Sequence, residues 1–291
     1  LLPRRSIVTG RRLVGRKLMG NLNGNLATHL QAIETDGFTI IKNAINSAVV
    51  EEIRNELAPF CQGQKPGRNN FEGHHTERVY ALLAKAPAVA KIVEHPLVLA
   101  LVDELLPENY LLSAALSILV HPGETPQPFH YDDAAELLGV DKPRPRFGVS
   151  TIWAFDDFTG PNGATEVIPR SHLWPEERVA KESEAVKVLM PAGSVLIFDG
   201  ALVHRGGANQ SNADRLAITP QYCSPSLRQI ENMVLAVPPT IAGQYSEKIQ
   251  NMLGYNIVSP GFKGYVDGMH PKKLIDKHYK GRKYKADLPA S

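Results

Sequence analysis

A series of short β-type runs, each closed by turn residues, occupies the middle of the chain and restricts its fold more than any other feature. Gly, Pro and Asn separate the runs, as in the turn Gly160-Pro-Asn-Gly163. The runs do not alternate with helical patterns, as a doubly wound parallel sheet would require. The pattern therefore predicts a sandwich or barrel. The predicted strands are residues 111–120, 147–155, 165–168, 185–190, 194–198 and 216–222.

Helical patterns flank this β-region on both sides. Leu26, Leu30 and Ile33 have helical spacing, and Gly37 ends the pattern before a short strand at 38–41. Asn46 is an N-cap candidate for the next helix, whose apolar stripe is Val50, Ile53, Leu57 and Phe60. Residues 76–85 and 87–106 give two further helical stretches, with an interruption near Pro96, and helix-compatible residues return after Ser224.

These patterns predict an α+β fold with a mainly β core. After a basic arm at residues 1–20, we predict a single domain at 21–291. It divides into a helical buttress at about 21–107, a β-core at about 108–224 and a helical or irregular cap at about 225–291.

Composition excludes several classes of protein. Of the 291 residues, 43% are hydrophobic, and the formal net charge is only +2, so no overall field recruits nucleic acid or an anionic membrane. Cys61 and Cys223 cannot form a disulfide framework and match no zinc motif. The apolar run at 111–120 is too short to cross a bilayer. We expect a soluble, cytoplasmic protein that has neither a nucleic-acid nor a membrane partner.

Basic residues gather at both ends. Residues 1–20 hold six Lys or Arg and no acid, which fits a solvated arm or an expression remnant, with an organelle transit peptide as the alternative. Residues 272–285 hold seven Lys or Arg against one Asp. This run is interpreted as a solvated face, with attraction of a phosphate-rich substrate as the alternative.

One group of residues has the composition of a metal site. In a strand, residues i and i+2 project to the same face, so His130 and Asp132 could hold one metal ion together. His204 follows a predicted strand and precedes two glycines, where the backbone can bend closely. Two histidines and one carboxylate form a facial triad that leaves three cis positions on octahedral Fe(II), although zinc also accepts these ligands.

Arg215 favours iron over zinc in this interpretation. It lies eleven residues after His204, at the start of the next predicted strand. A strand out and a strand back would place its guanidinium near the metal, where it could grip a carboxylate at a fixed distance. The far carboxylate of 2-oxoglutarate meets that requirement while its keto-acid end chelates iron.

With these residues, the chain resembles the phytanoyl-CoA dioxygenase family of iron and 2-oxoglutarate enzymes. Gln127-Pro-Phe-His-Tyr-Asp-Asp133 is similar to that family's first metal strand. Asn162-Gly-Ala-Thr-Glu-Val-Ile-Pro-Arg-Ser-His172 resembles its NGATxxxPGSH stretch, with Arg170 where Gly is usual. The resemblance covers roughly residues 25–265 and is strongest to fungal and bacterial natural-product tailoring members.

The resemblance implies a double-stranded β-helix that uses Fe(II), 2-oxoglutarate as cosubstrate, and O2. His130, Asp132 and His204 would bind the metal. Gln127 and Thr165 would contact 2-oxoglutarate together with Arg215, and Arg78 would be a further contact. Some members are dimers through their tails, which implies a homodimer through the C-terminal segment.

The predicted function is oxidation of C–H bonds, by hydroxylation, desaturation or a related rearrangement, in a hydrophobic small molecule. A terpenoid, meroterpenoid or alkaloid secondary metabolite is the expected substrate. The alternatives are an acyl-CoA 2-hydroxylase of phytanoyl-CoA type and a zinc-binding hydrolytic or structural protein.

Overall fold

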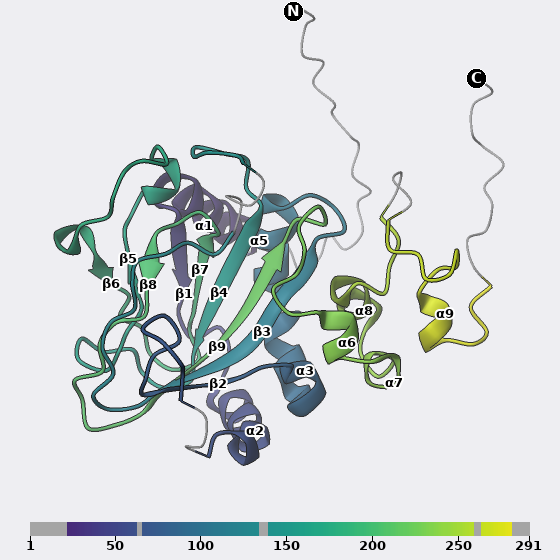
Figure 1. Ribbon diagram of the computed structural model, residues 1–291, viewed down its shortest axis with the longest axis horizontal. Helices are drawn as coiled ribbons and strands as arrows, with labels where there is room; N and C mark the ends of the chain where they lie inside the picture. Colours follow the sequence, from purple (N-terminus) through teal and green to yellow (C-terminus); the bar gives the residue numbers. More distant parts are fainter. Residues whose placement is uncertain (1–21, 63–65, 134–138, 259–262, 281–291) are drawn as a thin grey trace, which may run out of the picture.

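Two antiparallel sheets form the centre of the computed structural model, which describes residues 22–62, 66–133, 139–258 and 263–280 (Figure 1). The strands of the large sheet run in the order β1-β7-β4-β9-β3-β2, and those of the small sheet in the order β6-β5-β8. Within the described ranges the two sheets are separate hydrogen-bonded units. The large sheet consists of β1 (Phe38–Ile41), β2 (Thr76–Val79), β3 (Leu111–Val120), β4 (Gly148–Ala154), β7 (Val195–Asp199) and β9 (Arg215–Cys223). The small sheet consists of β5 (Glu166–Val167), β6 (Val186–Lys187) and β8 (His204–Arg205).

The large sheet is apolar on both faces because alternate side chains serve two different cores. In β7, Val195 and Ile197 join the core under the helices, whereas Leu196 and Phe198 join the core between the sheets. Burial on both faces produces near-continuous apolar runs instead of strict alternation. These runs made the strands easy to predict, and those predicted at 111–120, 147–155, 165–168, 194–198 and 216–222 are confirmed to within one residue at each end. Of the strand predicted at 185–190, only Val186–Lys187 form a strand, β6, and both of these residues are exposed.

The N-terminal helices cover the outer face of the large sheet. In Figure 1, α1 and α5 lie behind the sheet, and α2 and α3 lie at its lower edge. The predicted N-cap is confirmed, since the Asn46 side chain accepts a hydrogen bond from the Val49 N–H at 3.0 Å. The bounds are α1 (Leu22–Asp36), α2 (Ser47–Leu57), α3 (Leu82–Lys85), α4 (Ala90–Val93) and α5 (Pro96–Leu105), with 3-10 turns η1 (Ala58–Phe60) and η2 (Pro87–Val89).

Two predictions in the helical part are wrong. Residues 76–85 are not one helix, because Thr76–Val79 pair with β3 as strand β2 and only Leu82–Lys85 are helical. Pairing with a neighbouring strand outweighs local propensity there. Phe60 is exposed instead of lying on the apolar stripe of α2. Pro59 lies at the start of a 3-10 turn, which changes the angular spacing and removes Phe60 from the buried face.

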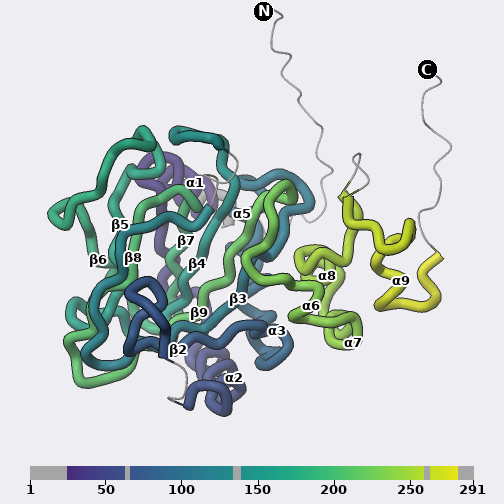
Figure 2. The backbone as a smooth tube through the Cα atoms, viewed as in Figure 1, coloured from purple at the N-terminus to yellow at the C-terminus, as the bar shows by residue number. Residues whose placement is uncertain are grey.

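The C-terminal helices lie beside the end of β3, at one side of the molecule (Figures 1 and 2). Met233, Ile249 and Leu253 belong to the same core as the N-terminal helices. No helix in the described ranges is long and apolar enough to cross a membrane. The basic arm predicted at 1–20 and residues 281–285 of the second basic run lie outside the described residues. The bounds are α6 (Met233–Ala236), α7 (Pro239–Ala242), α8 (Glu247–Leu253) and α9 (Lys272–Ile275), with 3-10 turns η4 (Ser171–Leu173) and η5 (Glu182–Glu184) before β6.

Candidate metal and cosubstrate site

Three predicted ligands meet between the two sheets. Asp132 Oδ1 lies 3.9 Å from His130 Nε2 and 3.7 Å from His204 Nε2. Among the described residues, this is the one group of three or more His, Cys, Asp or Glu side chains close enough to share a metal ion. One carboxylate oxygen and two imidazole nitrogens therefore face a common point.

Backbone hydrogen bonds bring the ligands together from distant parts of the chain. His204 opens β8, and its N–H and C=O pair with the C=O and N–H of His130 at 2.9 and 3.0 Å. The Asp132 N–H donates to Gly200 O at 2.8 Å. The strand expected at His130–Asp132 is thus reduced to a single bridge at His130, followed by a bend.

Both imidazoles are oriented by main-chain carbonyls. His130 Nδ1 lies 3.0 Å from Pro128 O, and His204 Nδ1 lies 3.0 Å from Leu202 O. A carbonyl can only accept, so each Nδ1 carries the hydrogen and each Nε2 presents its lone pair. Burial lowers the pKa of His130, which keeps that ring neutral and able to bind a metal at neutral pH.

Two neighbours hold the other oxygen of the carboxylate. Ser150 Oγ donates to Asp132 Oδ2 at 2.6 Å, and Gln221 Nε2 donates to the same oxygen at 3.1 Å. Ser150 and Gln221 are register partners on β4 and β9. Sequence reasoning missed both residues, although a polar side chain within an apolar strand is a signal that could have found them.

Two arginines line the same cavity without a carboxylate partner in the described part of the chain, Arg215 being buried and Arg78 half-buried. Arg215 Nη2 donates to Gly163 O at 2.6 Å, while its buried Nε has no hydrogen-bond partner among the described residues. Burial lowers the pKa of Arg215 to about 10 and also lowers the pKa of Arg78. Buried charges are normally paired, so the two guanidinium groups make this end of the cavity suited to bind an anion.

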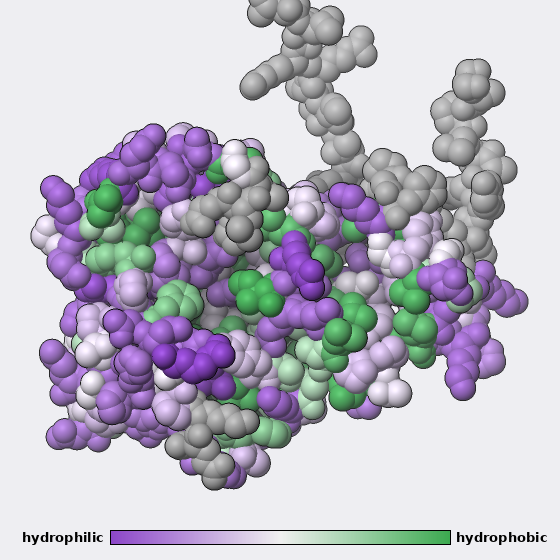
Figure 3. Space-filling view, viewed as in Figure 1, coloured by the Kyte–Doolittle hydropathy of each residue, from purple (hydrophilic) through white to green (hydrophobic). Residues whose placement is uncertain are grey.

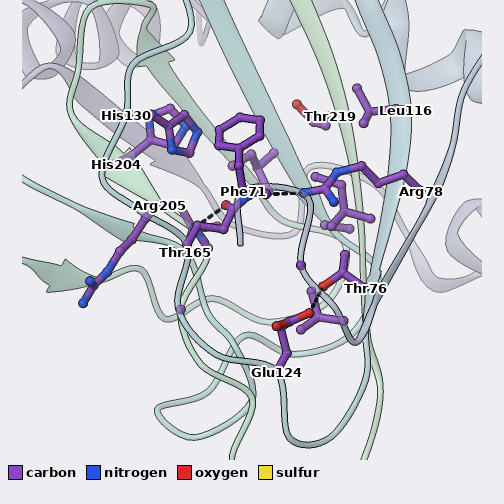
Figure 4. Close-up of a pocket in the computed structure, with 18 of the residues that line it drawn as sticks. Phe71, Thr76, Arg78, Leu116, Glu124, His130, Thr165, His204, Arg205 and Thr219 are labelled. Carbon is purple, nitrogen blue, oxygen red and sulfur yellow. Dashed lines mark hydrogen bonds between the residues drawn. The ribbon is translucent and has the colours of Figure 1, made fainter. Parts of the chain in front are cut away.

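Gln127 and Arg78 converge on one main-chain oxygen. Gln127 Nε2 donates to Phe71 O at 2.5 Å, and Arg78 Nη2 donates to the same atom at 3.3 Å (Figure 4). The Gly206 N–H donates to Gln127 Oε1 at 2.7 Å, and a Cβ at Gly206 would approach that oxygen to 2.8 Å. Sequence reasoning missed Phe71, whose ring centroid lies 4.8 Å from that of His130.

All the residues predicted for the site line one cavity of about 200 Å³. The metal group and the two arginines thus share an enclosure large enough for a small dicarboxylic acid. The predicted residues on its wall are Arg78, Gln127, His130, Asp132, Thr165, His204 and Arg215.

Two residues of the motifs that resemble the family, Asp133 and Arg170, have structural roles outside the metal group. Asp133 follows the ligand Asp132 directly in the chain. It forms a buried ion pair with Arg144 at 2.7 Å, both side chains being 1% exposed. Arg170 has a φ of 66°, in the left-handed region where glycine is favoured, which explains why Gly is usual at this motif position.

Comparison with known proteins decides the family. Residues 33–217 match the family model described as phytanoyl-CoA dioxygenase. The chain belongs to the phytanoyl-CoA dioxygenase family. A curated relative, dioxygenase ALT11 of Alternaria alternata, is 30% identical over 250 residues, which is 79% of this chain and 82% of the relative. Dioxygenase FUM3 of Gibberella moniliformis is 27% identical over 241 residues, covering 76% and 80%. The protein is therefore an oxidoreductase.

Solved structures support the fold. The α-ketoglutarate-dependent epimerase SnoN from nogalamycin biosynthesis aligns with a TM-score of 0.57 at 20% identity, covering 69% of this chain and 84% of SnoN. HygX from Streptomyces hygroscopicus, solved with nickel, 2-oxoglutarate and hygromycin B, aligns with a TM-score of 0.58 at 18% identity, covering 69% and 88%. The mixed architecture with antiparallel sheets is shared with these non-haem enzymes.

Proposed function

We propose that this protein is an Fe(II)/2-oxoglutarate-dependent dioxygenase that oxidises C–H bonds of a hydrophobic small molecule, such as a terpenoid, meroterpenoid or alkaloid secondary metabolite. The observation that carries the proposal is that three ligand atoms of a facial triad share one cavity with the guanidinium groups of Arg78 and Arg215, which have no ion-pair partner among the described residues. An N2O donor set fits Fe(II), and a dicarboxylate with a keto group fits the remaining positions and the arginines.

The bound iron supplies the coupling of O2 reduction to the decarboxylation of 2-oxoglutarate, which yields succinate, CO2 and the oxidising power for a C–H bond. The chain's own residues hold and orient the iron and the cosubstrate. His130, His204 and Asp132 offer one atom each, and Arg215 binds the far carboxylate of the cosubstrate. Thr165 and Gln127 are assigned to hydrogen bonds with the cosubstrate. When the cosubstrate binds, Gln127 and Arg78 would give up their hydrogen bonds to Phe71 O and donate to the cosubstrate instead.

The relatives support this assignment. ALT11 and FUM3 are named dioxygenases, and SnoN and HygX use α-ketoglutarate or were solved with 2-oxoglutarate bound. SnoN comes from nogalamycin biosynthesis and HygX was solved with hygromycin B bound, which favours a small organic molecule as the substrate of this protein.

The finer architecture belongs to the same proposal. We propose that the two sheets are the halves of a double-stranded β-helix and that residues 21–291 form a single domain; the antiparallel pairing within each sheet supports the first point. A homodimer through the C-terminal segment stays a prediction, which light scattering on purified protein would test.

The alternatives receive less support. An acyl-CoA substrate is the alternative that the family resemblance implies, and the basic run at 272–285 could attract its phosphates. Within the described part of that run, Lys272 is paired with Glu247. A zinc hydrolase leaves the two unpaired arginines without a role, and family membership favours the dioxygenase.

Isothermal titration of 2-oxoglutarate into the Ni(II)-loaded protein tests the proposal without turnover. We expect binding that depends on Ni(II) and weakens roughly 100-fold in Arg215→Met, because a bidentate charged contact is lost. Arg178→Met is the matched control, since Arg178 is half-exposed and pairs with Glu184. Equal binding by the wild type and Arg215→Met would contradict the assignment.

A further inference from the structure

A second cavity lies against the metal group. It has about 190 Å³ of space and shares Asp132, Gln221 and Ile230 with the first cavity. Arg78 and Arg215 line the first cavity and not the second. The metal group therefore lies between an anion-binding end and a separate compartment.

Most polar groups around the second cavity are already paired. Asp133 is paired with Arg144, and Ser150 Oγ donates to Asp132. Ser113 Oγ accepts from the Ile230 N–H at 3.1 Å. Arg228, the other charged residue on the wall, is exposed. Among the described residues, the buried Gln221 Oε1 has no hydrogen-bond partner and is one acceptor that the interior offers. The rest of what it offers to a ligand is mainly apolar surface, from Cys223, Leu227 and Ile230.

Exposed apolar side chains line the first cavity, and one of them, Ile230, also lines the second. Ile230 is 57% exposed, Phe71 50% and Tyr80 44%, and each comes from a different segment of the chain. In Figure 3, apolar residues (green) gather in the middle of the face, between the sheets and the C-terminal helices. Large apolar side chains grouped around a catalytic cavity are typical of a site that a ligand covers.

The position of Ile230 is fixed by its neighbours. The adjacent Glu231 side chain accepts hydrogen bonds from the Ala81 N–H at 2.7 Å and the Ala115 N–H at 2.9 Å. The Glu231 N–H also donates to Ser113 O at 2.8 Å. The main chain therefore holds Ile230 at the boundary of the two cavities, so its exposure is built into the fold.

We propose that the second cavity is a substrate subsite for an uncharged, apolar ring system, and that Ile230, at the boundary of the two cavities, determines which molecules fit. This proposal rests on the proposed function, because it places the substrate beside the metal and opposite 2-oxoglutarate. The substrate would extend over Ile230 from the metal group into the second cavity, away from Arg78 and Arg215.

The test uses N-phenyl-1-naphthylamine, an uncharged three-ring amine whose fluorescence rises in apolar surroundings. The Ni(II)-loaded wild type is titrated with and without saturating 2-oxoglutarate, and with excitation above the tryptophan absorption band. Ile230→Trp fills the boundary and Ile230→Ala opens it. Leu235→Trp is the matched control, because Leu235 is 76% exposed and lines neither cavity.

We expect the probe to bind with an affinity that 2-oxoglutarate leaves unchanged within about twofold. Ile230→Trp should weaken it at least about tenfold through overpacking, whereas Ile230→Ala and Leu235→Trp should not. Absence of probe binding, displacement of the probe by 2-oxoglutarate, or equal affinity in Ile230→Trp and Leu235→Trp would overturn the subsite. Binding of 2-oxoglutarate is measured separately, so loss of that binding would count against the proposed function and not against the subsite.

Discussion

Each ligand side chain in the metal group has one atom occupied by a neighbour and one atom left for the metal. Nδ1 of each imidazole donates to a main-chain carbonyl, and Oδ2 of Asp132 accepts hydrogen bonds from Ser150 and Gln221. Such outer contacts fix the orientation and basicity of the ligands, and they favour single-oxygen coordination by the carboxylate. Positions remain on the metal for the two oxygens of a keto acid and for dioxygen.

Ser150→Ala should lower metal affinity about 10- to 100-fold, because Gln221 alone would then hold Asp132 Oδ2. Titration of the metal-free protein with Ni(II) measures this change. Thr151→Val is the matched control, since Thr151 Oγ1 donates to Pro220 O at 2.7 Å and not to Asp132. An equal loss of metal affinity in both variants would show that Ser150 acts only through the stability of β4.

The strands were easier to predict than the contacts between them. Runs such as 111–120 have strong β-propensity and clear turn residues at their ends, so their bounds could be read from sequence. β2 was missed because its four residues become a strand only by pairing with β3. His130, Asp132 and His204 could be named from spacing and family resemblance, whereas Ser150, Gln221 and Phe71 depend on register and loop placement.

The turn before η4 contains the one departure from the family motif that the sequence showed. Arg170 has a φ of 66°, and its N–H donates to Asp36 O at 2.8 Å, which ties the turn to α1. Glycine adopts this conformation without the Cβ clash that costs other residues roughly 1–2 kcal/mol.

Arg170→Gly should therefore raise the free energy of unfolding by about 0.5–1 kcal/mol, after the entropy cost of glycine is subtracted. Arg170→Ala keeps the Cβ and should give no such gain. Urea denaturation of both variants beside the wild type measures the difference. A gain in Arg170→Ala as large as that in Arg170→Gly would contradict the conformational explanation.

A helical layer, the large sheet and the small sheet lie one behind another across the molecule. The metal group lies between the two sheets. The core under the helices draws residues from the N-terminal helices, the large sheet and the C-terminal helices. The helical layer therefore packs on one face of the large sheet, while the metal ligands lie on the side of its other face, His204 on β8 and His130 and Asp132 in the segment paired with it. This separation allows buried arginines and histidines to lie beside a stable apolar core.

Tyr222 joins the sheet to the helical layer through a buried hydrogen bond from its hydroxyl to Val93 O at 2.6 Å. Tyr222→Phe should lower the free energy of unfolding by about 1–3 kcal/mol, because a buried carbonyl loses its donor. Chemical denaturation measures this effect. Tyr80→Phe, on a half-exposed side chain, should stay within about 0.5 kcal/mol of the wild type. Equal stability of the two variants would show that the link between layers contributes nothing.

The most direct test of the central claim is an anaerobic titration of the metal-free protein with Fe(II) and then 2-oxoglutarate, followed by visible absorption. Chelation of iron by the keto acid should give a weak charge-transfer band that needs both components. The band should be lost in His204→Ala, and in Arg215→Met it should require far more 2-oxoglutarate. A protein that binds zinc tightly but gives no band with Fe(II) and 2-oxoglutarate would contradict the dioxygenase assignment.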